Sequence, residues 1–225
     1  MSGAARDASG VLEVADATLR QGRHVLFRDL SLRVEPGETL TLMGPSGSGK
    51  SSLLHWICGT LDPALSVEGS VRLGGSDLPG LPPERRGLGI LFQDDLLLPH
   101  LDIAANLAFG LRRPGGLGRR EWRAFRGERV SAALREAELE THARAFPREL
   151  SGGQRVRIAL MRTLLCEPRA LLLDEPFSRL DAPLRDRIRR FVFQHAGARG
   201  LPILLVTHDA DDARAADGEI LTLDN

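Results

Sequence analysis

The chain has 225 residues and no net formal charge, since 30 basic side chains balance 30 acidic ones. This length suits one sizeable domain, and the charge balance excludes a global field that would recruit nucleic acid or anionic lipid. No apolar run reaches the ~18 residues needed to cross a bilayer. Cys58 and Cys166 are too few for a disulfide framework, so we expect two buried free thiols.

The first part of the chain is rich in strand signals. Residues 11–14, 30–34 and 68–73 read as strands, and we expect them to pair antiparallel, partly outside the core sheet. Residues 39–43 and 88–92 are short apolar runs typical of buried strands. Residues 1–10 lack the apolar core of a signal peptide, so we expect a cytoplasmic protein unless a partner holds it on a membrane.

A glycine-rich loop at residues 44–52 fits the pattern G-x-x-x-x-G-K-[ST]. It lies between the strand at 39–43 and a helical run at 53–58, which is the context that a phosphate-binding loop requires. A glycine-rich turn that holds nothing is the alternative. The motif predicts that backbone N–H groups and a helix N-terminus face a phosphate, with Lys50 near the β- and γ-phosphates and Ser51 on Mg²⁺. The predicted phosphate-binding residues are Gly44, Pro45, Ser46, Gly47, Ser48, Gly49, Lys50, Ser51 and Ser52.

Lys50 is the only lysine in a chain whose other basic side chains are arginines, apart from histidine. The bias toward arginine therefore did not act at this position. A compact point charge is required there, and the planar fork of arginine would not fit.

Residues 94–166 change to a helical pattern. Asp102 is a suitable cap for a helix that reaches Leu111, and an apolar stripe from Trp122 to Ala137 recurs at helical spacing. We favour a core stripe over a base-stacking platform for its two aromatic residues. The arginines at 112–129 indicate either a nucleic-acid patch or a solvated helix face. We favour the solvated face, because glutamates are interleaved and the global charge is zero.

After residue 168 strands alternate with helices, which predicts a mostly parallel sheet with ligands at the carboxyl ends of its strands. The apolar strand at 171–174 ends in Asp174, followed by Glu175. Beside a phosphate-binding loop, this pair is typical of a Mg²⁺-associated carboxylate and a base that activates water. His208 directly follows another buried strand, at 203–207.

Residues 150–154, Leu-Ser-Gly-Gly-Gln, begin a second helix whose N-terminus can bind an anion. A simple serine N-cap is the alternative. One nucleotide already has its loop at 44–52, so the second site suggests that two chains sandwich the nucleotides.

From about residue 11 to 223 the chain resembles the ATP-binding cassette (ABC) ATPases. The resemblance implies that Gln93 meets Mg²⁺ and the attacking water, that Glu175 is the catalytic base, and that His208 contacts the γ-phosphate. Residues 178–181 look like the family's D-loop, with arginine where alanine is commoner. Lys50 joins Glu175, His208 and Gln93 as a catalytic residue. The further nucleotide-binding residues are Ser151, Gly152, Gly153, Gln154 and Asp181, and the metal ligands are Ser51, Gln93 and Asp174.

The implied fold is an α/β P-loop NTPase with an antiparallel β subdomain and an inserted helical subdomain. A single domain would span residues 1–225, with 11–93 and 167–225 forming the nucleotide-binding core and 94–166 the helical part. Residues 98–106 look like the importer subset, and residues 174–181 are similar to the YnjD-type cassettes. The implied cofactors are ATP and Mg²⁺. The implied partners are a second cassette subunit, membrane permease subunits and a substrate-binding protein, but no nucleic acid, with the chain peripheral on the inner face of the plasma membrane. The alternative is a soluble ABC ATPase in an assembly or repair role.

Two details are particular to this chain. The family usually stacks adenine on an aromatic residue after the first strand, whereas residues 19–23 offer Leu-Arg-Gln-Gly-Arg and the chain has no tyrosine. We therefore expect weak recognition of adenine. Residues 96–99, Leu-Leu-Leu-Pro, are expected either to line a groove for a permease helix or to be buried in the lobe.

Overall fold

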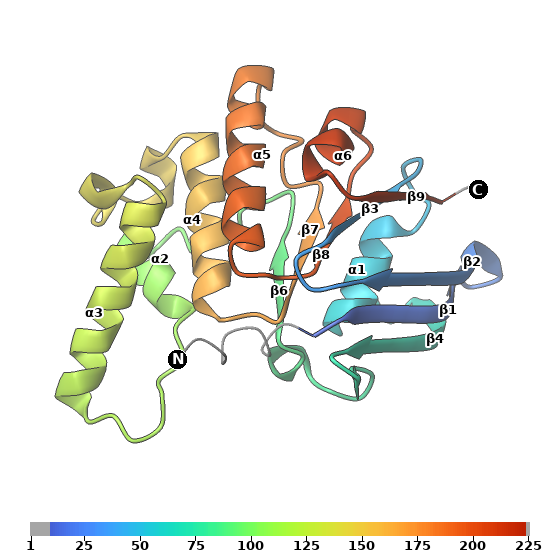
Figure 1. The fold of residues 1–225 in the computed structure, drawn as a ribbon, viewed down its shortest axis with the longest axis horizontal. Coiled ribbons are helices and arrows are strands. Elements are labelled where there is room, and N and C mark those ends of the chain that lie inside the picture. The colour runs from blue at the N-terminus through green and yellow to red at the C-terminus, as the bar shows by residue number, and fades with distance from the viewer. Residues whose placement is uncertain (1–9, 224–225) are drawn as a thin grey trace. The chain divides into compact units, whose positions relative to one another are not determined.

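The structure, a computed structural model, describes residues 10–223 (Figure 1). It divides into two compact units. The first, called here the sheet unit, comprises the described residues up to Ile90, Pro168–Glu175 and those from Phe193 onward. The second, the helical unit, comprises Leu91–Glu167 and Pro176–Val192. Within residues 10–223, none of the helices combines the length and the apolar character needed to span a bilayer.

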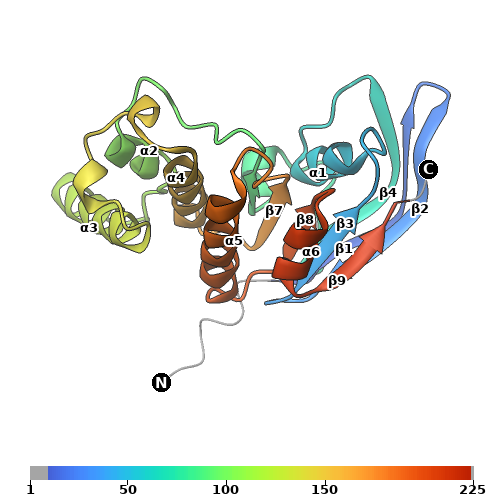
Figure 2. The same ribbon diagram turned by 90° about the horizontal axis from the view of Figure 1, so that it is seen from above.

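The sheet unit contains the expected parallel sheet, with five strands in the order β6-β7-β8-β3-β9. These strands are β3 (Thr39–Met43), β6 (Leu88–Leu91), β7 (Ala170–Asp174), β8 (Ile203–Val206) and β9 (Glu219–Thr222). Strand β3 pairs in parallel with β8 and β9, and β7 pairs in parallel with β8. Every residue of β7 and β8 is buried, as continuous apolar runs are when both faces of a sheet are covered. Helices α1 (Lys50–Cys58) and α6 (Ala210–Ala216) lie on opposite sides of this sheet (Figure 2).

A second, antiparallel sheet has the strand order β2-β1-β4-β5. Its strands are β1 (Leu12–Gln21), β2 (His24–Val34), β4 (Leu65–Leu73) and β5 (Ser76–Asp77). One core cluster joins the inner faces of β1, β2 and β4 to α1 and to the parallel sheet. The two sheets and the glycine loop between β3 and α1 confirm the predicted α/β fold class.

The helical unit packs α2 (Ile103–Phe109), α3 (Arg119–Glu136) and α4 (Gly152–Leu165) against one another. Short 3₁₀ turns lie at Pro83–Arg85 in the sheet unit and at Glu140–His142 and Pro147–Glu149 in the helical unit. Helix α5 (Ala182–Gly197) has residues in both units. Asp102 caps α2 as predicted, because its Oδ1 accepts from the Ala105 N–H at 2.7 Å.

The predicted stripe along α3 is buried only in its second half. Val130, Ala133 and Leu134 are buried, whereas Trp122 and Phe125 are half-exposed. The prediction of two buried thiols is correct for Cys58 but wrong for Cys166. Cys166 follows the last residue of α4, where the helix no longer presents a covered face.

Candidate nucleotide-binding site

The loop between β3 and α1 requires glycine at two positions where its backbone turns. Gly49, the residue before α1, has φ 92°, and a Cβ there would lie 3.1 Å from the side chains of Leu19 and Phe27. Gly44 has φ 152°, and its Cβ would lie 2.8 Å from the carbonyl oxygen of Leu223. Pro45, Ser46, Gly47 and Ser48 complete the connection, and Ser52 lies in the first turn of α1. The loop conformation therefore depends on the absence of a Cβ atom at Gly44 and Gly49.

Lys50 is folded against the loop that precedes it. Its Nζ donates to the carbonyl oxygens of Gly44 at 2.8 Å and of Pro45 at 2.6 Å. Ser48 Oγ lies 3.4 Å from the same nitrogen. Burial lowers the pKa of the Lys50 ammonium, against the opposing attraction of Glu175 and Asp174. The ammonium is thus held over the loop, where phosphate oxygens can replace the carbonyls as acceptors.

Ser51 and Asp174 meet across the sheet unit. The Ser51 hydroxyl donates to Asp174 Oδ1 at 2.9 Å, although the two residues are far apart in sequence. Burial raises the pKa of the Asp174 carboxyl, and the hydrogen bond from Ser51 opposes this shift. A hydroxyl and a carboxylate in contact supply the hard oxygen donors that Mg²⁺ prefers, and one or two protein ligands are enough when phosphates provide the rest. The residues present therefore fit the metal that the motif implies.

Glu175 and His208 form the second contact of the site. They follow the neighbouring parallel strands β7 and β8, and the Glu175 N–H donates to the Val206 carbonyl at 3.0 Å. Nδ1 of His208 lies 2.9 Å from Oε1 of Glu175. Glu175 has φ 47°, a left-handed conformation that a non-glycine residue adopts at a cost, and such strain concentrates at functional sites.

Hydrogen bonds hold the buried Thr207, the residue before His208, and the sequence did not reveal them. The Thr207 hydroxyl donates to Asp212 Oδ2 at 2.9 Å and accepts from the Asp209 N–H at 3.1 Å. Thr207 and Asp212 are both buried. Asp209 in turn caps α6, because its side chain accepts from the backbone N–H groups of Asp211 and Asp212. The only sequence signal is an acidic residue one turn into the helix after His208.

In the helical unit, residues 151–154 begin α4 as predicted. Ser151 Oγ accepts from the Gln154 N–H at 3.3 Å, and Gln154 Oε1 accepts from the Ser151 N–H at 2.8 Å. This reciprocal capping box fixes the helix start and leaves Ser151 exposed. Gly152 is the first residue of the helix, and a Cβ on Gly153 would lie 2.8 Å from Leu184. Glycine is therefore required at Gly153 by packing against α5.

Asp181 caps α5, since its Oδ1 accepts from the Leu184 N–H at 3.0 Å. Gln93 is exposed just after β6. The two residues after it form ion pairs with arginines of the same unit. Asp94 pairs with Arg179, and Oδ2 of Asp95 lies 3.0 Å from Nε of Arg155.

Arg162 extends this anchoring, because it donates to the carbonyl oxygen of Leu96 at 2.8 Å and to that of Asp95 at 3.1 Å. Leu96 is exposed and has φ 48°, whereas Leu97 is buried. These arginine contacts join segments that are distant in sequence and that no sequence pattern had connected.

The sheet unit thus gathers the predicted phosphate loop, Asp174, Glu175 and His208, because their strands are adjacent and parallel. The helical unit holds Gln93, Ser151, Gly152, Gly153, Gln154 and Asp181. In the region expected to meet adenine, Leu19 and Phe27 are buried beneath Gly49. Arg20 lies 4.0 Å from Glu68, and Gln21 is exposed at the end of β1.

A phosphate-binding loop on a parallel sheet, with an acidic pair and a histidine after neighbouring strands, defines a P-loop NTPase. The family model described as ABC transporter matches residues 27–178, which is more than half of the chain. The chain therefore belongs to the ABC transporter family, as an ATP-binding protein with ATPase activity.

Relatives support the same assignment. The chain is 41% identical over 213 residues to the "Uncharacterized ABC transporter ATP-binding protein YnjD" of Escherichia coli (strain K12), and the match covers 95% of each chain. It is 41% identical to the "Putative 2-aminoethylphosphonate import ATP-binding protein PhnT" of Salmonella typhimurium, covering 87% of this chain and 52% of that protein. It is 39% identical to the "Fe(3+) ions import ATP-binding protein FbpC" of Rhizobium etli, covering 90% and 55%. The chain spans about half the length of these two import proteins.

Proposed function

We propose that this chain is the ATP-hydrolysing subunit of an importer, working as a pair of identical chains that close on two ATP molecules. The observation that carries the proposal is the arrangement at one sheet edge. Because β3, β8 and β7 are adjacent and parallel, the phosphate loop, Glu175 and His208 follow strands that end side by side. Such an edge suits phosphoryl transfer to water, in which positioning and charge stabilisation supply most of the catalysis.

Each side chain has a role in this scheme. Lys50 holds the β- and γ-phosphates, Glu175 accepts a proton from the attacking water, and His208 orients the γ-phosphate. Ser51 and Asp174, which are in contact in the sheet unit, would hold Mg²⁺. The ion, when bound, would neutralise charge that develops on the phosphate oxygens.

The second copy of the chain would complete each nucleotide site. Helix α4 begins after an exposed Ser151, and the backbone N–H groups of Gly152 and Gly153 in its first turn have no acceptor within the helix. Such a terminus attracts a phosphate, and Asp181 at the start of α5 belongs to the same unit. We place one ATP between the phosphate loop of one chain and residues 151–154 of its partner. Closure and reopening would then be a population shift driven by ATP binding and hydrolysis.

The transport partners follow from the relatives rather than from this chain's own geometry. Two relatives of similar identity are named for import of different cargoes, 2-aminoethylphosphonate and Fe(3+) ions. Cassettes this similar serve different solutes, so we assign the choice of cargo to separate permease and substrate-binding subunits. This chain would lie in the cytoplasm, against the inner face of the plasma membrane.

Two experiments test the proposal. Light scattering on the Glu175→Gln variant should give a monomer without nucleotide and a dimer with ATP, and a monomer in both conditions would overturn the two-chain site. A tagged copy of the chain recovered from detergent-solubilised membranes should carry a polytopic membrane subunit. Recovery of only soluble assembly or repair factors would replace the importer with the alternative class.

A further inference from the structure

The N-terminal half of α3 carries a dense group of exposed arginines. Four of them, Arg119, Arg120, Arg123 and Arg126, lie within the first eight residues of the helix and are all exposed. Within the described part of the chain, none of these four makes an ion pair, whereas Arg129 in the next turn pairs with Glu167 at 2.8 Å. The positive charge of this half-helix is therefore not compensated by the helical unit.

The charges are separated around the helix even though they alternate along the sequence. At about 100° per residue, Arg119, Arg123 and Arg126 fall within about 60° of one another. Glu121 and Glu128 fall on the opposite side of the helix. Glu121 is also engaged, since its Oε2 accepts from the Gly118 N–H at 2.7 Å. The interleaved glutamates that favoured a neutral, solvated face in the sequence thus leave a purely basic stripe in space.

Two aromatic residues border this stripe. Trp122 and Phe125 are half-exposed, and their rings stack with centroids 5.9 Å apart and an interplanar angle of 26°. The Arg129 guanidinium lies 5.9 Å from the centroid of Phe125. A tryptophan beside a row of cations is typical of helices that rest in the headgroup layer of a membrane.

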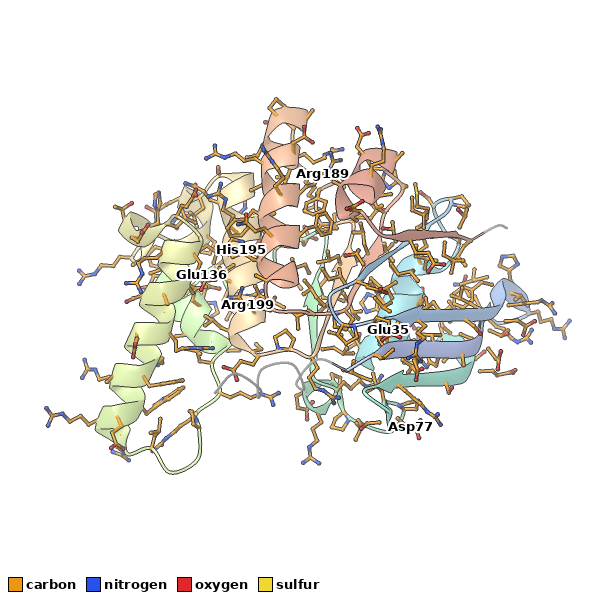
Figure 3. The ribbon with its side chains drawn as sticks, viewed as in Figure 1. Glu35, Asp77, Glu136, Arg189, His195 and Arg199 are labelled. Carbon is orange, nitrogen blue, oxygen red and sulfur yellow. The ribbon has the colours of Figure 1, made fainter. Side chains whose placement is uncertain are left out.

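The basic half of α3 contains none of the buried residues of the helix. In Figure 1 the amino-terminal end of α3 extends past α2 and α4. The buried residues Val130, Ala133 and Leu134 all lie in the other half, toward Glu136, which is labelled in Figure 3. Packing therefore accounts for the second half of α3 but not for the side chains of the first half.

We propose that the basic face of α3, defined by Arg119, Arg120, Arg123, Arg126 and Trp122, binds the headgroups of anionic phospholipids. Guanidinium groups suit this ligand because their planar forks match phosphate oxygens. The face is less suited to a single-stranded nucleic acid, because bases need open aromatic faces for stacking, and Trp122 and Phe125 stack on each other. The inference is independent of the importer assignment, because it rests on the charge distribution of one helix.

The test uses the full chain with two kinds of vesicle, one of phosphatidylcholine and one of phosphatidylcholine mixed equally with phosphatidylglycerol. We expect flotation with the anionic vesicles only, and loss of binding as salt rises, because screening shortens the range of the attraction. The triple variant Arg119→Gln, Arg123→Gln, Arg126→Gln should bind these vesicles roughly 100-fold more weakly, at about fivefold per arginine. Glutamine retains good helix propensity, so the helix should persist by circular dichroism.

A matched control removes the same charge without touching the stripe. Arg85→Gln, Arg144→Gln, Arg187→Gln changes three exposed arginines that lie on separate segments. This control should keep vesicle binding, and both triple variants should keep the ATPase rate of the wild type. Equal losses in the two variants, equal binding to both vesicle types, or no vesicle binding by the wild type would each overturn the proposal. Binding of a labelled oligouridylate in place of vesicles would replace the lipid with a nucleic acid.

Discussion

The Nδ1 atom of His208 lies 2.9 Å from Oε1 of Glu175, so the side chains that follow two neighbouring strands are in contact. The imidazole can donate from Nδ1 only if the proton is on that nitrogen, which leaves Nε2 for a second partner. The contact therefore orients the carboxylate proposed as base, and it leaves Nε2 of the imidazole as the nitrogen that can meet a phosphate.

Glu175→Gln should lower ATP turnover by roughly 10²–10⁴ while ATP binding persists, which is the usual scale for a general base. The amide oxygen can still accept from Nδ1 of His208, so the arrangement of the site should be kept while the base is lost. Phosphate release measures turnover, and Glu140→Gln on an exposed turn is the control. Near-normal release by Glu175→Gln would remove the role assigned to this residue.

Lys50 should be the one internal amine that acylating reagents label, and ATP should protect it. Burial lowers its pKa, which raises the fraction of reactive neutral amine, and phosphates would cover the same nitrogen. Mass spectrometry after acetylation, with and without ATP, measures the protection. The α-amino group provides an internal control that should label equally in both states. Equal labelling of Lys50 in both states would contradict its place under the phosphates.

Asp174→Asn should raise the unfolding temperature of the nucleotide-free protein at neutral pH while abolishing ATP hydrolysis. Burial raises the pKa of Asp174 in the folded chain above its value in the unfolded chain, so the fold binds the proton more tightly. Stability from this group is therefore highest below the unfolded pKa of about 3.9 and declines as pH rises through the folded pKa.

The asparagine avoids this loss because it carries no charge and can still accept from Ser51. Thermal melts should show its advantage at pH 7 shrinking toward pH 4. The exposed Asp62→Asn should show no such trend. If Asp174→Asn melted below the wild type at pH 7, Asp174 would be stabilising as a carboxylate.

Substitution by asparagine should affect the free energy of unfolding differently at Leu96 and at Leu97. Leu97 is buried, so Leu97→Asn should cost about 3 kcal/mol by removing apolar contacts and burying an amide. Leu96 is 56% exposed with φ 48°, so Leu96→Asn should be neutral or should stabilise the fold by up to about 1 kcal/mol, since asparagine tolerates the left-handed region.

Urea denaturation of both variants measures the difference. The result bears on the groove hypothesis, because only Leu96 of this pair has a side chain that a permease helix can reach. Comparable destabilisation by both variants would show that Leu96 is covered in solution.

Recognition of the base should be weak. No tyrosine is present, Phe27 is packed beneath Gly49, and Arg20 and Gln21 occupy the end of β1. Phosphate contacts do not distinguish adenine from guanine, so ATP and GTP should bind with similar affinity. Gln21→Tyr, or Arg20→Tyr, should tighten ATP binding by up to about tenfold, or ~1.4 kcal/mol. Calorimetry in the Glu175→Gln background measures both effects, and a hundredfold preference of the wild type for ATP would show that another residue reads the base.

The sequence predicted best those features that are contiguous. The glycine loop is flanked by its strand and helix as expected, and Ser151 and Asp102 cap their helices, because each motif brings its own local hydrogen-bond partners. Strand β1 was predicted over only its first residues. Its later half is polar and irregular, with Asp16 at φ 52° and shifts in register, so the alternation that reveals a strand is lost.

Contacts between distant segments were not predictable. The hydrogen bond from Thr207 to Asp212 and the ion pair of Arg155 with Asp95 involve residue types that are common on surfaces and carry no pattern of their own. The short α6 and β9 were also missed, because alanine and aspartate dominate the helix and only a few residues form the strand. In α3 the sequence order of charges was misleading, since a helix places neighbours in sequence on different faces.

The strand order of the parallel sheet has a consequence for synthesis of the protein. Strand β3, which leads into the phosphate loop, lies between β8 and β9, and these two are the last strands in the sequence of the described chain. While a ribosome is still making the chain, both edges of β3 lack their partners until these last strands have emerged. The loop from Gly44 to Lys50 can therefore take its final form only after β8 and β9 have been made, and a nascent chain that stops before Ile203 should bind no ATP.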